Sequence, residues 1–189
     1  QFLLSDWSGE VLTNGKSLDA QNLPGSYLIE WFIYKLPINI LFLFILGTIY
    51  ILFNKSKFDN FTKYSIFFVV TIFSFFSISQ PLAYDGIRQY LFLIPFFVHI
   101  VSIFLSELLN YEKIKLVSIG AITISIIYMF SSQSSLYPFN YIYFNELVDE
   151  ERITYSCQDM NGCGEWETDY WGLSGKSLIL DSMDDESDR

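Results

Sequence analysis

The chain has 189 residues, of which 51% are hydrophobic and 19% aromatic, and its mean hydropathy is +0.32. These values exclude an ordinary soluble globular domain and indicate a polytopic membrane protein. The net charge is −10, and from Glu146 onward there are 13 acidic residues against three basic ones, which argues against nucleic acid as a partner.

The first segment, residues 1–35, is polar and begins with Gln1 rather than Met, so we expect it to belong to a longer protein. Asn14-Gly15 and Pro24-Gly25 predict turns within it. The aromatic stretch from Tyr27 to Tyr34 predicts a helix at the membrane interface that leads into Pro37, since proline is tolerated in the first turn of a helix.

Four apolar runs follow, and none of them contains Asp, Glu, Lys or Arg. They extend from Leu36 to Phe53, from Tyr64 to about Leu82, from Tyr90 to about Ser106 and from Leu116 to about Ser132. Their length and their lack of alternation favour membrane-spanning helices over strands, because about 20 apolar residues cross a bilayer. Pro95 predicts a kink in the third run.

The predicted fold is therefore all-α: a polytopic bundle of about four transmembrane helices in residues 36–132. Residues 1–35 form an outside loop with its interfacial helix, and residues 133–189 form an acidic C-terminal extension that also faces outside. Lysines gather in two of the loops, which by the positive-inside rule are cytoplasmic: Lys55, Lys57 and Lys63 in one, Lys113 and Lys115 in the other. This places the protein in the cell (inner) membrane, with the extension in the periplasm or exterior.

A charged turn, Tyr84-Asp85-Gly86-Ile87-Arg88, separates the second and third runs at the outer face. A guanidinium matches the geometry of phosphate oxygens and stays charged, so Arg88 is a candidate ligand for a lipid phosphate. The alternative is an interfacial arginine that reaches water or pairs with Asp85. Asp85 is expected to orient Arg88 or to cap the next helix rather than to act in catalysis.

The order of four motifs resembles the C-terminal half of GT-C type membrane glycosyltransferases, the relatives of protein O-mannosyltransferases and of the aminoarabinose transferases that modify lipid A. The motifs are the stretch from Gly15-Lys16 to Tyr27-Leu28, the turn Tyr84–Arg88, the segment Tyr137-Pro138 with Tyr143–Val148, and the block Asp169–Ser174. The residue after Arg88 is often His in such sequences and is Gln89 here.

The resemblance implies transfer of a sugar from a polyprenyl-phosphate donor to an extracytoplasmic acceptor. Tyr84, Asp85 and Arg88 would then hold the donor phosphate. In this family the catalytic carboxylate lies in an N-terminal outside loop, so the chain is expected to contain no catalytic residue of its own. The acceptor is not indicated, and no cofactor is predicted.

The remaining polar residues suggest more limited roles. His99 in the third run is expected to be a neutral histidine bonded to a neighbouring helix through Ser or Tyr, with a functional site as the alternative. Lys35 is expected to anchor the topology, or else to attract anionic lipid. Cys157 and Cys163 predict a disulfide rather than a metal site, because no His accompanies them.

Two other functions share these features. A transporter or flippase of lipid-linked intermediates would also place an arginine at the headgroup level, but it would carry polar groups deep in several helices. A non-catalytic membrane scaffold would leave Arg88 dispensable.

Overall fold

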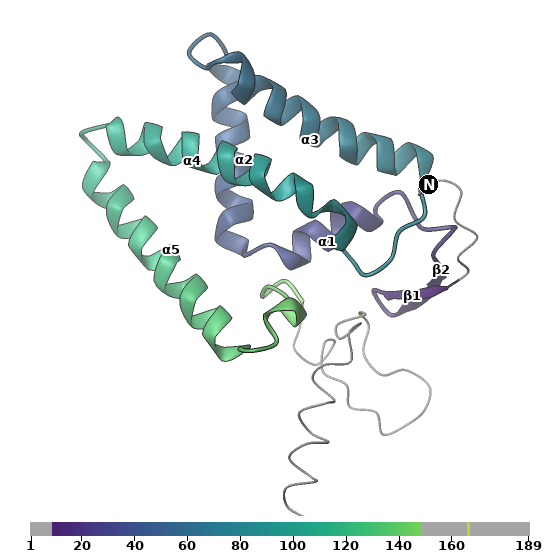
Figure 1. Ribbon diagram of the computed structural model, residues 1–189. Coiled ribbons are helices and arrows are strands. Elements are labelled where there is room, and N and C mark those ends of the chain that lie inside the picture. The colour runs from purple at the N-terminus through teal and green to yellow at the C-terminus, as the bar shows by residue number, and fades with distance from the viewer. Residues whose placement is uncertain (1–8, 149–165, 167–189) are drawn as a thin grey trace, which may run out of the picture.

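The computed structural model describes residues 9–148 and Trp166, and the described chain is mostly helical (Figure 1). A short hairpin of β1 (Glu10–Thr13) and β2 (Lys16–Asp19) precedes the helices. The helices that follow are α1 (Tyr27–Lys35), α2 (Ile38–Phe53), α3 (Asn60–Ser79), the 3₁₀ segment η2 (Arg88–Leu93), α4 (Ile94–Asn110), α5 (Lys115–Ser135) and the 3₁₀ turn η3 (Asn140–Ile142).

The hairpin confirms the turn predicted at Asn14-Gly15. Both residues have positive φ angles, 51° and 71°, and the antiparallel register pairs Thr13 with Lys16. A two-residue turn whose residues both have a left-handed backbone conformation has a twist that matches that of the flanking strands. The strands themselves were not predicted, so the fold is helical with one small β element.

Three helical segments are long and apolar enough to cross a membrane: α3, the segment Arg88–Asn110 formed by η2 and α4, and α5. A fourth is reached if α1 and α2 count as one span, although they meet at a bend of 116°. Helix α2 alone has 16 residues and a length of about 24 Å. All four predicted apolar runs therefore form helices. The helix of the first run, α2, has the fewest residues.

Pro95 lies at the start of α4 rather than in the helix interior, where it was predicted to cause a kink. It occupies the first turn of α4, where its missing N–H leaves no helical hydrogen bond unmade, and η2 precedes it with 3₁₀ geometry. Pro95 thus lies where the 3₁₀ segment gives way to the α-helix.

Helix α4 holds the bundle together, because it packs against α2, α3 and α5. The α2–α4 contact is close at Gly47, where an added Cβ would lie 3.0 Å from the Phe104 Cβ. On the same interface Phe44 stacks on Phe97 with ring centroids 4.1 Å apart. Dispersion between such surfaces drives helix association where no hydrophobic effect operates.

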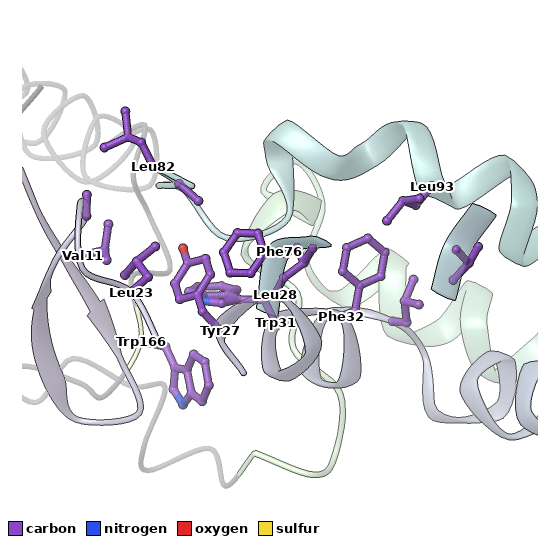
Figure 2. Close-up of a cluster of buried hydrophobic side chains, with 14 of the residues drawn as sticks. Val11, Leu23, Tyr27, Leu28, Trp31, Phe32, Phe76, Leu82, Leu93 and Trp166 are labelled. Atoms are coloured by element: carbon purple, nitrogen blue, oxygen red, sulfur yellow. The ribbon is translucent and has the colours of Figure 1, made fainter. Parts of the chain in front are cut away.

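The helix predicted from Tyr27 to Tyr34 is present as α1, and one side of it forms the centre of the protein core. Tyr27, Leu28, Trp31 and Phe32 are all buried, whereas Ile29 and Ile33 on the other side remain exposed. Trp166, from the C-terminal extension, packs edge-on against Trp31 with ring centroids 5.2 Å apart (Figure 2). This extension is therefore tied to α1 at Trp166.

Candidate functional site

A cavity of about 280 Å³ lies at the end of the bundle that carries Arg88. Three parts of the chain line it. The first is the corner between α1 and α2, the second is the turn that leads into η2, and the third is the end of α5 with the segment after it. We call it the cationic cavity, because its charged lining residues include Lys35 and Arg88 together with a single acid, Asp85.

The turn at Asp85-Gly86 is held directly against α1. Asp85 and Gly86 have φ angles of 55° and 64°, and a Cβ added to Gly86 would lie 2.7 Å from Trp31 Cε3. The Gly86 N–H donates to the Tyr27 hydroxyl at 3.3 Å. Only glycine combines this backbone conformation with such a close approach, so Gly86 determines where the turn places Arg88.

Arg88 forms an ion pair with Asp85, in which Nη1 donates to Oδ2 at 2.9 Å. The Asp85 side chain is largely buried and the Arg88 side chain is 45% exposed. This ion pair is the arrangement expected if Asp85 orients Arg88, and it is also the pairing that the alternative reading of Arg88 expects. A guanidinium carries five N–H groups in a planar fork, a geometry that suits the oxygens of an anion.

Tyr84 has a different position from its two neighbours in the motif. It packs, partly buried, against the hydrophobic core and is not among the residues that line the cavity. Of the three predicted substrate-binding residues, the structure thus brings Asp85 and Arg88 to one cavity and leaves Tyr84 beside it.

Lys35 is the second cation of the cavity, and it comes from the last residue of α1. Its Nζ donates to the Tyr141 carbonyl at 3.2 Å and lies 3.8 Å from the centroid of the Phe144 ring. Lys35 lies at the corner outside the α2 span, and burial there lowers its pKa from 10.5 to about 7. Sequence reasoning treated this residue as a topology anchor, or else as a cation that attracts anionic lipid, and did not place it in one cavity with Arg88.

Tyr143 contributes a buried hydroxyl to the same cavity. The residue is 6% exposed, and its hydroxyl makes no well-formed hydrogen bond within the described part of the chain. Burial raises the pKa of Tyr143, more than the nearby Ser132 hydroxyl lowers it. The phenol therefore stays protonated and can donate. A buried hydroxyl that makes no well-formed hydrogen bond could donate to a bound acceptor.

Asn145 explains why Tyr143 is held in this place. Its side-chain amide donates to the carbonyls of Ile33 and Leu36, and its backbone N–H donates to the Tyr34 carbonyl at 2.9 Å. These bonds satisfy carbonyls that the end of α1 leaves unpaired. The Tyr143–Val148 motif thus docks on the end of α1, a contact that no periodicity in the sequence indicates.

His99 lies away from the cavity and is bonded to a neighbouring helix, as predicted. Its partner is the Thr62 hydroxyl, 3.2 Å from Nε2, rather than a Ser or Tyr. The Phe61 ring packs edge-on against it with centroids 4.9 Å apart. This environment accounts for His99 as a packed polar residue between α3 and α4.

Gln89 carries a second set of buried polar atoms. Neither the nitrogen nor the oxygen of its side-chain amide has a hydrogen-bond partner among the residues that the structure describes. Gln89 does not line the cationic cavity.

Several predictions fall outside the described residues. The Cys157–Cys163 disulfide and the Asp169–Ser174 block lie there, and both stay predictions. Within residues 9–148 and Trp166, no group of three or more His, Cys, Asp or Glu side chains could hold a metal ion.

Comparison with known proteins adds no relative: no protein-family model, curated protein or solved structure matches the chain. The chemistry of the cationic cavity is therefore the main guide to function. Two cations and a neutral hydroxyl donor around one small space suit an anion with several acceptor oxygens, such as a phosphate.

Proposed function

We propose that the protein is an integral membrane protein whose cationic cavity binds the phosphate of a lipid. The observation that supports this is the meeting of Arg88, Lys35 and the Tyr143 hydroxyl around one cavity at an end of the helical bundle. A phosphate there would receive a bidentate fork, a point charge and a hydroxyl donor. A carboxylate has only two oxygens and so offers fewer acceptor sites for these three groups.

We further propose that the lipid is a polyprenyl-phosphate sugar donor, and that the protein is the membrane part of a glycosyltransferase. In such a transfer the bond between the sugar and the phosphate oxygen breaks, and the lipid phosphate leaves with the bonding electrons. Fixed cations stabilise that developing charge. Asp85 is already paired with Arg88, so the base that accepts the proton of the acceptor hydroxyl is proposed to be a carboxylate other than Asp85.

The proposal places the protein in the cell (inner) membrane, with the cationic cavity at the periplasmic or outer face. The lysine-rich loops then lie in the cytoplasm. The acceptor is left open.

Binding of farnesyl phosphate to the purified protein in lipid nanodiscs tests the phosphate site. Arg88→Ala should weaken binding by about 10- to 100-fold, the usual worth of a hydrogen bond to a charged group. Arg88→Lys should retain part of the affinity, because it keeps the charge and loses the fork. Lys57→Ala is the matched control, since Lys57 pairs with Glu107 in the described structure and does not line the cavity. Wild-type affinity in Arg88→Ala would refute the site.

A transfer assay with purified protein, lipid-phosphate sugar and acceptor tests the proposed reaction itself. If the Arg88 contact resembles an oxyanion donor, Arg88→Ala should lose about 2–4 kcal/mol of transition-state stabilisation there. An unchanged rate across donor concentrations would favour a scaffold in which Arg88 is dispensable.

A further inference from the structure

The cationic cavity also carries two amide side chains, which come from the end of α5 and the segment after it. Gln133 lies two residues before the last residue of α5, and Asn140 begins η3. Both residues are half-buried, and both line the cavity that Lys35 and Arg88 line from other elements. The two amides therefore belong to the same site as the two cations. We call them the amide pair.

Hydrogen bonds fix the orientation of both amides. The Asn140 Nδ2 donates to the main-chain carbonyl of Gln133 and to its side-chain Oε1, each at 3.0 Å. A main-chain carbonyl can only accept, so the Asn140 amide must present its nitrogen to Gln133, and the Gln133 amide must present its oxygen in return. This leaves Asn140 Oδ1 as an acceptor and Gln133 Nε2 as a donor, and neither atom makes a hydrogen bond within the described residues.

The amide pair suits a different chemical group from the one that the cations suit. The oxygens of a phosphodiester only accept hydrogen bonds, so they match Lys35, Arg88 and the Tyr143 hydroxyl, but they cannot donate to Asn140 Oδ1. A hydroxyl group both donates and accepts. Two neighbouring hydroxyls of a sugar can therefore donate to Asn140 Oδ1 and accept from Gln133 Nε2 at the same time.

The cavity has room for a group besides the phosphate. Its volume of about 280 Å³ is close to the lower limit of about 300 Å³ for small-molecule sites in proteins, whereas a phosphate is a single small tetrahedral group. Such sites combine apolar walls with a few polar groups that fix the orientation of the ligand. Here Ile87 and Leu91 contribute apolar lining between the cations and the amide pair's side of the cavity.

On the basis of the proposed function, we infer that the amide pair is the subsite that binds the sugar next to the lipid phosphate. The ligand is a lipid phosphodiester whose second ester group carries neighbouring hydroxyls, and Gln133 and Asn140 determine specificity for that group. A purely structural role would be to cap α5, because the Gln133 carbonyl is one of those that a helix end leaves unpaired. A cap would stabilise the fold without distinguishing one phosphodiester from another.

The test compares farnesyl phosphodiesters that differ only in the second ester group. Equilibrium binding of the glucosyl, mannosyl and cyclohexyl esters is measured on the intact protein in nanodiscs. The cyclohexyl ester has the same charge and ring size as the sugar esters but no hydroxyls. Gln133→Leu and, independently, Gln133→Met remove the side-chain amide and keep the carbonyl that Asn140 caps, so both should fold. Ser134→Leu is the matched control, because Ser134 is exposed on α5 and does not line the cavity.

We expect both Gln133 variants to weaken binding of the tighter sugar ester by about threefold to tenfold, the worth of a neutral hydrogen bond, and to leave binding of the cyclohexyl ester within about twofold. Ser134→Leu should change neither. Unchanged binding of both sugar esters in the two Gln133 variants, or an equal loss for all three esters, would overturn the sugar subsite while the phosphate site stands. Binding of the cyclohexyl ester that does not depend on Arg88 would instead overturn the proposed function.

Discussion

Lys35 and Arg88 line the same cavity from different helical segments, and they differ in how their charges are balanced. Arg88 pairs with Asp85 at 2.9 Å, whereas Lys35 forms no ion pair among the described residues and donates to the Tyr141 carbonyl. Lys35 is thus the cation whose charge depends on what occupies the cavity.

Binding of a lipid phosphate should therefore depend on pH through Lys35, whose pKa in the free protein is lowered by burial to about 7. Below that pKa the ammonium is present and attracts the anion. Above it the lysine is neutral and must take up a proton to bind the anion well, so affinity should fall by up to about tenfold per pH unit. The measurement uses a farnesyl phosphodiester at pH 6 to 9, because a diester does not change charge in this range.

Lys35→Arg is the informative comparison, since its guanidinium stays charged and should remove the pH dependence. Lys35→Met should bind weakly at every pH. A wild-type curve that stays flat from pH 6 to 9 would show that Lys35 does not contact the anion.

Tyr143→Phe should separate affinity from stability. The hydroxyl makes no well-formed hydrogen bond in the described structure, so its removal should leave the melting temperature unchanged or slightly raised. Farnesyl phosphate binding should nevertheless weaken by about 10- to 100-fold, the worth of one hydrogen bond to a charged acceptor. A drop in melting temperature with unchanged affinity would indicate a purely structural tyrosine.

Gly86→Ala should destabilise the turn that carries Arg88. The new Cβ would lie 2.7 Å from the Trp31 ring, and the residue would keep a φ of 64°, so a loss of about 1–3 kcal/mol is expected. Thermal unfolding in detergent, followed by tryptophan fluorescence, measures this loss of stability. Gly120→Ala is the control, because its Cβ meets nothing within 4 Å and a helical alanine should be slightly stabilising. Equal stability of the two variants would contradict the close packing at Trp31.

Cysteine labelling tests the orientation proposed from the lysines. Single cysteines at Ser56 and Ser135, both exposed and in a background without Cys157 and Cys163, are treated with a membrane-impermeant reagent on whole cells. Ser56→Cys should be protected and Ser135→Cys should react. The reverse pattern would place the cationic cavity in the cytoplasm and exclude an extracytoplasmic transfer.

The sequence by itself determined where the long helices of this protein lie. Uncharged apolar runs of this length and without alternation favour helices, and the Asn14-Gly15 pair favours a hairpin turn, because both depend on local chemistry. The charged turn at Asp85–Arg88 was also identified from sequence, since ionisable groups between two apolar runs have few places to lie.

Tertiary structure alone decided which of these elements meet. Lys35 is separated from Arg88 by two helices, and it joins the cavity because α1 bends 116° away from α2 and packs under the Asp85-Gly86 turn. Tyr143 joins because Asn145 pairs with the carbonyls at the end of α1. Contacts of this kind depend on backbone groups left unpaired at a helix end and on the fit of one glycine against one indole, and neither has a periodic signature in the sequence.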